Sequence, residues 1–224
     1  MNFQTPTSMN FNRVLICAFS FLLSCGVSAN RAPDAIDDLY IVETKYKNII
    51  NKINQSLTKN QSAFSNSNMK LAEFVDNNLL SFWSSSKTLK GLLGKKSWTS
   101  LALSEQRSLV RSFNNTIQRY VQEGFGQYEG QQLEFVSVKL SPSKTIGYLT
   151  IKVKPNLMPN FNIDLKIAML EGAWFIYDAG AQGINYIKLK KDSFRKQIKN
   201  KGINGILTEL NTKNSGYIPS QLSK

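Results

Sequence analysis

The sequence predicts an α+β fold, in which N-terminal helices precede a four-stranded antiparallel twisted sheet and a closing C-terminal helix. Apolar residues recur at three- and four-residue steps as far as Gly124, which is the period of helices with one buried face. Between Leu133 and Ala179 they recur at every second position, which is the period of strands. The links between the predicted strands are short, and short links make neighbouring strands antiparallel.

Four helices are predicted before the sheet. The first begins near Asp37, the third is capped by Ser86 and stopped by Gly94, and the fourth is capped by Ser104. Segment 55–68 contains few large apolar residues and many Ser, Asn and Gln, which predicts a loop. The four helices cover approximately residues 37–57, 68–82, 86–94 and 104–124.

The four predicted strands are separated by turn-forming residues. After the last strand an extended segment leads into a basic helix, which Gly202 ends. One more short turn of helix follows, and the polar tail from Asn211 is expected to be loose. The strands are Leu133–Leu140, Thr145–Lys154, Phe161–Leu170 and Ala173–Ala179, and the extended segment is Ile184–Leu189.

Two of the strands present faces of branched aliphatic side chains. A sheet face of this kind must be covered by another layer of structure. The cover leaves either a filled core or a cavity large enough for an apolar ligand, and the alternation of residues does not distinguish the two. The side chains are Leu149, Ile151 and Val153 on the second strand and Ile163, Leu165 and Ile167 on the third.

Composition excludes the commonest catalytic chemistry. The chain contains no histidine, which removes Ser-His-Asp and Cys-His catalysis and the usual zinc sites. Both cysteines, Cys17 and Cys25, lie in the first 29 residues. Asp164, Glu171 and Asp178 lie in or beside the central hairpin without a spacing that forces a catalytic pair, and Asp178 is expected to be structural. A carboxylate-dependent hydrolase remains an alternative, and no metal motif is present.

Residues 1–29 have the pattern of an export signal. Asn12-Arg13 supply a positive start, 14–23 form a short apolar run, and 27–29 form a small-residue cleavage site after Ala29. Segment 22–25 also resembles a lipoprotein cleavage box, which would leave a lipidated Cys25 at the mature N-terminus. Both alternatives predict an exported protein, and cleavage at Ala29 would leave a mature chain without thiols.

The formal net charge is +13, and seven of the cations lie close together near the C-terminus. They could form a solvated helix face, contact an anionic membrane surface or an acidic partner, or bind nucleic acid. The predicted export and the lack of an aromatic-interleaved basic motif argue against nucleic acid. The cations are Lys188, Lys190, Lys191, Arg195, Lys196, Lys199 and Lys201.

Two segments contain aromatic, glycine and charged residues in a recognisable order. The first segment contains Leu93-Gly94, Trp98, Glu105-Gln106-Arg107, Phe113, Tyr120, Phe125, Tyr128 and Gly130. The second contains Gly172-Ala173-Trp174-Phe175-Ile176-Tyr177-Asp178, Gly183-Ile184, Phe194, Ile198, Gly202-Ile203, Leu207 and Leu210. In this order the two segments resemble the MlaC family, also called toluene-tolerance auxiliary proteins. Asn185 stands where the family often has serine, and Trp98 follows Leu93-Gly94 later than is usual.

The resemblance implies a non-enzymatic periplasmic phospholipid carrier, an auxiliary of an ABC transporter. Such a protein holds acyl chains in an apolar pocket between sheet and helices, so its cargo is phospholipid and no cofactor is needed. The implied partners are an inner-membrane transporter complex with an MCE-type subunit and an outer-membrane lipoprotein complex, with transient contact to the membrane surface. Its implied role is lipid transport that maintains outer-membrane lipid asymmetry.

These observations predict residues 1–29 as a signal peptide, 30–211 as the lipid-binding domain and 212–224 as a polar tail. The main alternative is an exported binding or scaffold domain with a filled core and a basic docking face. The residues expected to contact lipid are Leu149, Ile151, Val153, Ile163, Leu165, Ile167, Phe113, Tyr120, Trp174 and Ile176.

Overall fold

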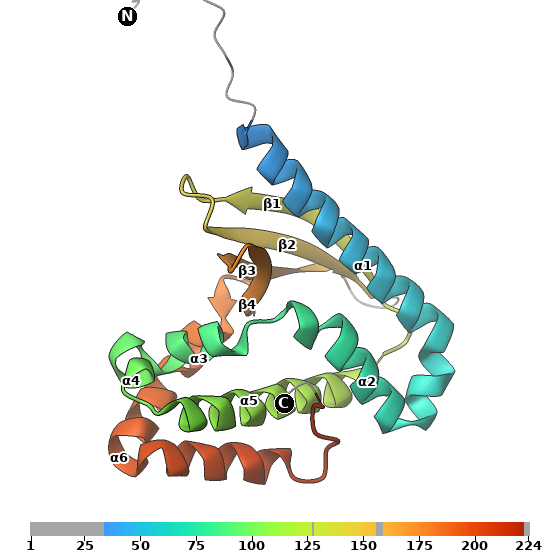
Figure 1. Cartoon of the computed structure of the whole chain (residues 1–224). Coiled ribbons are helices and arrows are strands. Elements are labelled where there is room, and N and C mark those ends of the chain that lie inside the picture. Colours follow the sequence, from blue (N-terminus) through green and yellow to red (C-terminus); the bar gives the residue numbers. More distant parts are fainter. Residues whose placement is uncertain (1–33, 127, 156–158, 222–224) are drawn as a thin grey trace, which may run out of the picture. The chain divides into compact units, whose positions relative to one another are not determined.

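The computed structural model describes residues 34–126, 128–155 and 159–221 (Figure 1). The predicted signal segment, with Cys17, Cys25 and the Ala29 cleavage site, lies outside the described residues. The described helices are α1 (Asp34–Asn66), α2 (Asn68–Asn78), the 3-10 turn η1 (Leu80–Phe82), α3 (Ser85–Leu93), α4 (Lys95–Thr99), α5 (Leu103–Phe125) and α6 (Tyr186–Asn214). The described strands are β1 (Gln132–Leu140), β2 (Ile146–Lys154), β3 (Phe161–Leu170), β4 (Ala173–Ala181) and β5 (Ile184–Asn185).

The strands form an antiparallel sheet in the order β1-β2-β3-β4-β5, so the α+β class and the antiparallel arrangement are confirmed. The prediction of four strands is wrong, because the described sheet has five. Ile184 and Asn185 pair with Ala181 and Gly180, and the chain then turns into α6 at Tyr186. A strand of two residues has no detectable alternation, which is why the sequence predicted only an extension there.

One face of the sheet is covered by α1, which crosses it in Figure 1. Asn54 fixes α1 against β1, because its side-chain amide donates to the Leu133 carbonyl at 2.7 Å and accepts from the Leu133 N–H at 2.9 Å. Near the start of α1, Asp38 pairs with Lys144 in the β1–β2 turn at 2.8 Å. The two contacts join opposite ends of β1 to the helix.

The apolar core consists of two clusters. The α1–sheet cluster is Val42, Tyr46, Ile50, Val138, Leu149, Ile151, Leu165, Ile167, Trp174 and Ile176. The helical cluster is Phe64, Leu71, Val75, Leu80, Leu89, Leu92, Leu93, Trp98, Leu109, Phe113, Ile117, Phe194, Ile206 and Leu210. Trp83, which follows η1, packs against both clusters and therefore connects the two halves of the core.

The predicted loop over 55–68 is wrong, since α1 continues to Asn66. Leu57 packs against the helical cluster and Phe64 is buried in it, so tertiary packing overrides the weak helix propensity of the polar residues between them. Figure 1 shows the far end of α1 extending past the sheet to the helices below it. This extension depends on contacts with residues that are distant in sequence, so a local sequence pattern could not predict it.

Several predicted helix boundaries are shifted. The cap of α3 is Ser84 rather than Ser86, and its hydroxyl accepts the Lys87 N–H. The N-cap of α5 is Ala102 rather than Ser104, and the Ala102 N–H donates to the Glu105 carboxylate at 2.8 Å. The predicted second helix is interrupted at Leu79, where φ is −123°. Short helix α4 was not predicted.

The C-terminal helix is longer than the predicted one. Gly202 has a φ of +63°, which interrupts α6, and helix continues beyond it to Asn214. The tail predicted to be loose from Asn211 is instead attached to the body. Asn214 is buried against α5, and the Ser220 hydroxyl donates to buried Asp76 on α2 at 2.7 Å.

Candidate functional site

The α1–sheet cluster contains most of the residues expected to contact lipid. Their side chains pack beneath α1, and each of the buried residues has at most 9% of its surface exposed. Ile163 packs against the cluster at its edge, and Val153 is buried on the same face of β2. The buried members are Leu149, Ile151, Leu165, Ile167, Trp174 and Ile176.

Phe113 and Tyr120 do not lie in this cluster. Both are on α5, where Phe113 is buried in the helical cluster and Tyr120 is 42% exposed. Their rings lie 5.9 Å and 6.4 Å from that of Tyr186 at the start of α6. The helical period predicted that they share a face, but only the fold determines which layer that face contacts.

A cavity of about 440 Å³ lies where the helices meet the β3–β4 hairpin. This volume is within the range of small-molecule sites. One part of its wall is apolar, with Leu80, Trp83, Val110, Leu170 and Phe175, and the other is polar, with Ser84, Ser85, Ser86, Asn114 and Glu171. Because Trp83 also packs on the α1–sheet cluster, the cavity adjoins that layer.

The polar wall is held in place by hydrogen bonds. The Ser85 hydroxyl donates to the Asn114 side-chain oxygen at 2.6 Å, which joins α3 to α5. The Ser84 N–H donates to the Ile176 carbonyl at 2.7 Å, so the start of α3 continues the hydrogen bonding beyond the edge of β4. These serines were not predicted as site residues, because a Ser-rich segment before a helix signals only a cap.

Lys45 on α1 lies beside this cavity. Its ammonium donates to the Trp174 carbonyl at 2.9 Å and lies 5.9 Å from the ring centroids of both Phe82 and Phe175. Phe175 is part of the cavity wall. Partial burial lowers the pKa of Lys45, since removal from water disfavours the charged form. No pattern in the sequence distinguishes Lys45, which is not part of the apolar cluster beneath α1.

Tyr46, the next residue, is 1% exposed within the α1–sheet cluster. Its hydroxyl has no hydrogen-bond partner among the described residues. Burial raises the pKa of this phenol, so it remains a neutral O–H donor. In the sequence Tyr46 is one more residue at helical apolar spacing, so its hydroxyl could not be recognised as unusual.

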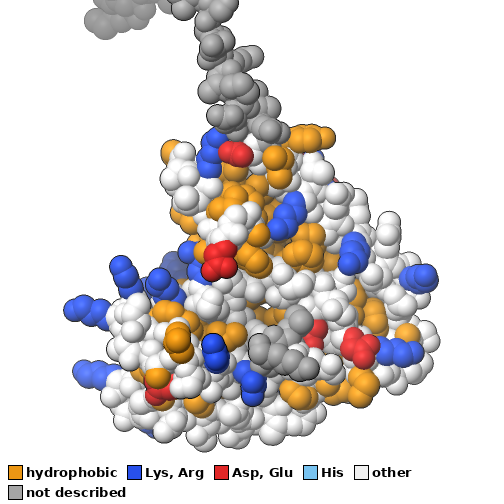
Figure 2. Space-filling model, in the orientation of Figure 1, with side chains coloured by type: hydrophobic (Ala, Val, Ile, Leu, Met, Phe, Trp, Pro, Cys, Tyr) orange, Lys and Arg blue, Asp and Glu red, His pale blue; other side chains and the backbone are white. Residues whose placement is uncertain are grey.

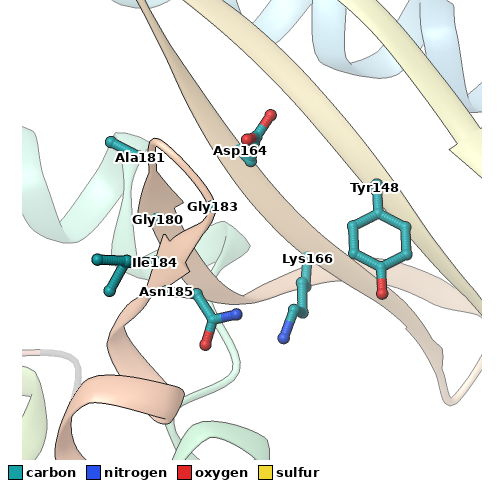
Figure 3. Close-up of a pocket in the computed structure, with 8 residues that line it drawn as sticks. All are labelled: Tyr148, Asp164, Lys166, Gly180, Ala181, Gly183, Ile184 and Asn185. Carbon is teal, nitrogen blue, oxygen red and sulfur yellow. The ribbon is translucent and has the colours of Figure 1, made fainter.

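A smaller cavity of about 190 Å³ lies on the sheet near β5 (Figure 3). Figure 3 shows Lys166 and Asn185 pointing to one side of the cavity while Asp164 points away from them. Lys166 pairs at 3.1 Å with Asp178, which is fully buried and also accepts the Ile187 N–H. This bonding supports the structural role predicted for Asp178. Asp164 instead accepts from the Thr150 hydroxyl at 2.9 Å.

Within the described part of the chain, no group of three or more acidic or sulfur side chains could hold a metal ion. None of the helices described there combines the length and the apolar character needed to cross a bilayer. The described residues therefore present two features of chemical interest, an apolar layer beneath α1 and an adjoining amphipathic cavity with a lysine beside it.

Comparison with known proteins agrees with this architecture. The phospholipid-binding protein of Ralstonia solanacearum, solved in complex with a phospholipid, has a similar fold with a TM-score of 0.68 and 15% sequence identity. The similarity covers 77% of this chain and 96% of that one. No functionally curated protein matches the sequence. The family model of the MlaC protein matches residues 47–212, more than half of the chain, and this chain belongs to the MlaC family.

Proposed function

We propose that this protein is a non-enzymatic periplasmic phospholipid carrier, which shuttles lipid between inner-membrane and outer-membrane complexes and so helps to maintain outer-membrane lipid asymmetry. Membership of the MlaC family supports this proposal, as does a similar fold in a protein solved with a phospholipid. The predicted export signal supports the compartment. The partners would be an MCE-type transporter complex and an outer-membrane lipoprotein complex.

The observation that carries the proposal is the adjacency of the apolar α1–sheet cluster to the 440 Å³ cavity, since Trp83 lines the cavity and packs against the cluster. Acyl chains would lie against Leu149, Ile151 and Ile167, and the head group would lie toward the polar wall of the cavity. Each buried methylene contributes about 0.8 kcal/mol, so two acyl chains contribute on the order of 20 kcal/mol. That is enough to prevent spontaneous loss of lipid to water.

Loading requires α1 to move away from the sheet. Leu149 and Ile167 are fully buried, and Val42 and Ile50 of α1 cover them with at most 3% of their own surface exposed. A lipid therefore displaces contacts between α1 and the sheet and replaces them with contacts to acyl chains. Because apolar contacts are exchanged for apolar contacts, the net cost of this opening is small compared with the gain from removing the chains from water.

The test is solvent extraction of the protein purified from the cell envelope, with the phospholipid counted per chain by mass spectrometry. We expect a stoichiometric amount of phospholipid and uptake of labelled lipid from liposomes. Val110→Trp, whose larger side chain would occupy the 440 Å³ cavity, should lower lipid content, whereas Leu103→Trp at a 71% exposed position of the same helix should not. Absence of phospholipid from the unmodified protein would exclude the carrier function.

A basic surface formed by α3, α4 and α6 is the candidate for transient contact with the membrane. Helices α3 and α6 pack together, which brings Lys90, Lys95 and Lys96 to the same corner as Lys188 and Arg195. All five are exposed, and none forms an ion pair with a described carboxylate. Figure 2 shows basic side chains gathered over this corner. Near an anionic bilayer each cation contributes about 1 kcal/mol.

Vesicle sedimentation tests this surface. Lys95→Glu with Lys96→Glu should weaken binding to vesicles that contain an anionic lipid, while Lys52→Glu with Lys59→Glu on α1 should change it less. High salt should remove the difference, since exposed charges are screened. Equal binding by the two double variants would show that the corner formed by α3 and α6 is not the membrane contact.

One observation favours the alternative of an exported scaffold domain. The side chains beneath α1 are so fully buried that they already form an ordinary filled core. A protein with this function would be purified without lipid and would take up none from liposomes. The extraction experiment therefore separates the two functions directly.

A further inference from the structure

Two consecutive residues of α1 carry polar groups that lack the partners such groups normally have. Consecutive helical side chains point about 100° apart. Tyr46 therefore faces the sheet together with Val42 and Ile50, while Lys45 reaches the open edge of β4 at Trp174.

The Tyr46 hydroxyl is an isolated donor in an apolar layer. Nearly all buried hydroxyls are hydrogen-bonded, because an unpaired one loses its bonds to water without replacement. None of the described residues bonds to this one. A phenylalanine would fill the same space without that cost. The hydroxyl is neutral, so the group that it suits is an uncharged acceptor such as a carbonyl oxygen.

The Lys45 ammonium forms one strong hydrogen bond. Among the described residues, no carboxylate lies within ion-pair distance of it. An ammonium has three N–H donors, so two remain beyond the bond to the Trp174 carbonyl. The faces of Phe82 and Phe175 attract a cation but do not neutralise it. A partly desolvated cation beside a cavity suits an anionic oxygen, and a phosphate is the strongest such acceptor in a lipid.

We propose that Lys45 and Tyr46 together recognise the polar end of a diacyl phospholipid, with the ammonium binding the phosphate and the hydroxyl donating to an acyl ester carbonyl. The order of the protein groups matches the order of the groups in the lipid. In a diacyl phospholipid the phosphate is at the polar end, the ester carbonyls come next, and the acyl chains extend beyond the esters. The Lys45 ammonium lies over the ring of Phe175, which lines the cavity, whereas Tyr46 lies in the apolar layer together with the aliphatic sheet face. This inference rests on the proposed carrier function and names the two residues that would recognise the polar end of its phospholipid.

The test measures binding of three lipids to the delipidated full mature chain: a phosphatidylglycerol, a diacylglycerol and a fatty acid. Tyr46→Phe should weaken binding of both esterified lipids about fivefold or more, and Lys45→Met should weaken binding of the phosphatidylglycerol about tenfold while leaving the diacylglycerol little changed. Lys45→Arg should restore most of the phosphate preference. Tyr40→Phe and Lys52→Met, at exposed positions of α1, are the matched controls.

Stability provides a second measurement. In the lipid-free state, Tyr46→Phe should unfold at the same or a higher temperature than the unmodified protein, because it removes an unpaired buried hydroxyl. In the presence of phosphatidylglycerol its gain in stability should be smaller than that of the unmodified protein. A purely structural role would change both states equally.

The outcomes separate this inference from the carrier function. If the unmodified chain binds phosphatidylglycerol and the Lys45 and Tyr46 variants bind as their controls do, recognition by these residues is wrong and the carrier function stands. If the unmodified chain binds none of the three lipids, both proposals are wrong. Equal affinity for fatty acid and phosphatidylglycerol would contradict the proposed recognition of the polar end.

Discussion

The Asp178 carboxylate on β4 accepts the main-chain N–H of Ile187 at 3.1 Å, which joins the last long strand of the sheet to the first turn of α6. The same carboxylate is fully buried and pairs with Lys166 on β3. An N–H at the start of a helix lacks an intrahelical partner, and a carboxylate there satisfies it and interacts favourably with the helix dipole. Asp178 therefore fixes where α6 begins relative to the sheet.

Asp178→Asn should lower the free energy of unfolding by about 2–3 kcal/mol. The amide can still accept the Ile187 N–H, but the ion pair is lost, and Lys166 recovers only part of its hydration because its side chain is 26% exposed. Urea unfolding measures the change. Asp164→Asn, on an exposed carboxylate of the same sheet, is the control and should stay within about 0.5 kcal/mol of the unmodified protein. Equal effects of the two variants would contradict the role assigned to Asp178.

Gly180→Ala should destabilise the join between β4 and β5. A Cβ atom there would clash with the Ile184 carbonyl oxygen and lie 2.7 Å from the Asn185 Cα, and main-chain atoms cannot rotate away. We expect a loss of about 1–3 kcal/mol and faster hydrogen exchange at β5. Gly124→Ala on α5 is the matched control, since nothing lies within 4 Å of its Cβ position. That change should be neutral or stabilising by up to about 1 kcal/mol.

Thr88→Val should weaken the junction between the two core clusters. The Thr88 hydroxyl donates to the Tyr177 carbonyl at 2.6 Å and accepts the indole N–H of Trp83 at 3.1 Å. Valine preserves the shape but leaves both groups unpaired, which costs about 1–3 kcal/mol. Urea unfolding followed by tryptophan fluorescence reports the change. Thr99→Val, at an exposed position on α4, should have little effect, and a similar loss there would show that valine itself is responsible.

Glu123→Gln should reduce the loss of stability in acid. Hydrogen bonds from Arg119 first and from Tyr217 second lower the pKa of Glu123 below its usual 4.5. A carboxyl whose pKa is lowered by folding stabilises the native state above its unfolded pKa, and that contribution disappears as pH falls through the folded value. Urea midpoints at pH 7, 5 and 3 should therefore fall less steeply for the variant. At high salt the two profiles should approach each other, and identical profiles at low salt would contradict the prediction.

The sequence by itself determined the four long strands, because alternation is a local property and a misregistered strand would bury polar groups. β3 and the start of β4 agree with the predicted Phe161–Leu170 and Ala173–Ala179, as does the turn between them. It also identified the aliphatic faces of β2 and β3 and, through two short motifs, the family. The structural role predicted for Asp178 followed from the lack of a second carboxylate at a spacing that forces a catalytic pair.

Only the tertiary structure decided what covers those faces. The extension of α1 to Asn66 depends on burial of Phe64 among helices distant in sequence, so no local pattern could predict it. Phe113 and Tyr120 share a helical face, but the packing of α5 against α6 directs it away from the sheet. Lys45 and Tyr46 are an ordinary lysine and an ordinary core tyrosine in the sequence. Their missing partners become visible only when the chain brings β4 and the rest of the sheet against α1, because a hydrogen-bond partner is a property of the folded surroundings.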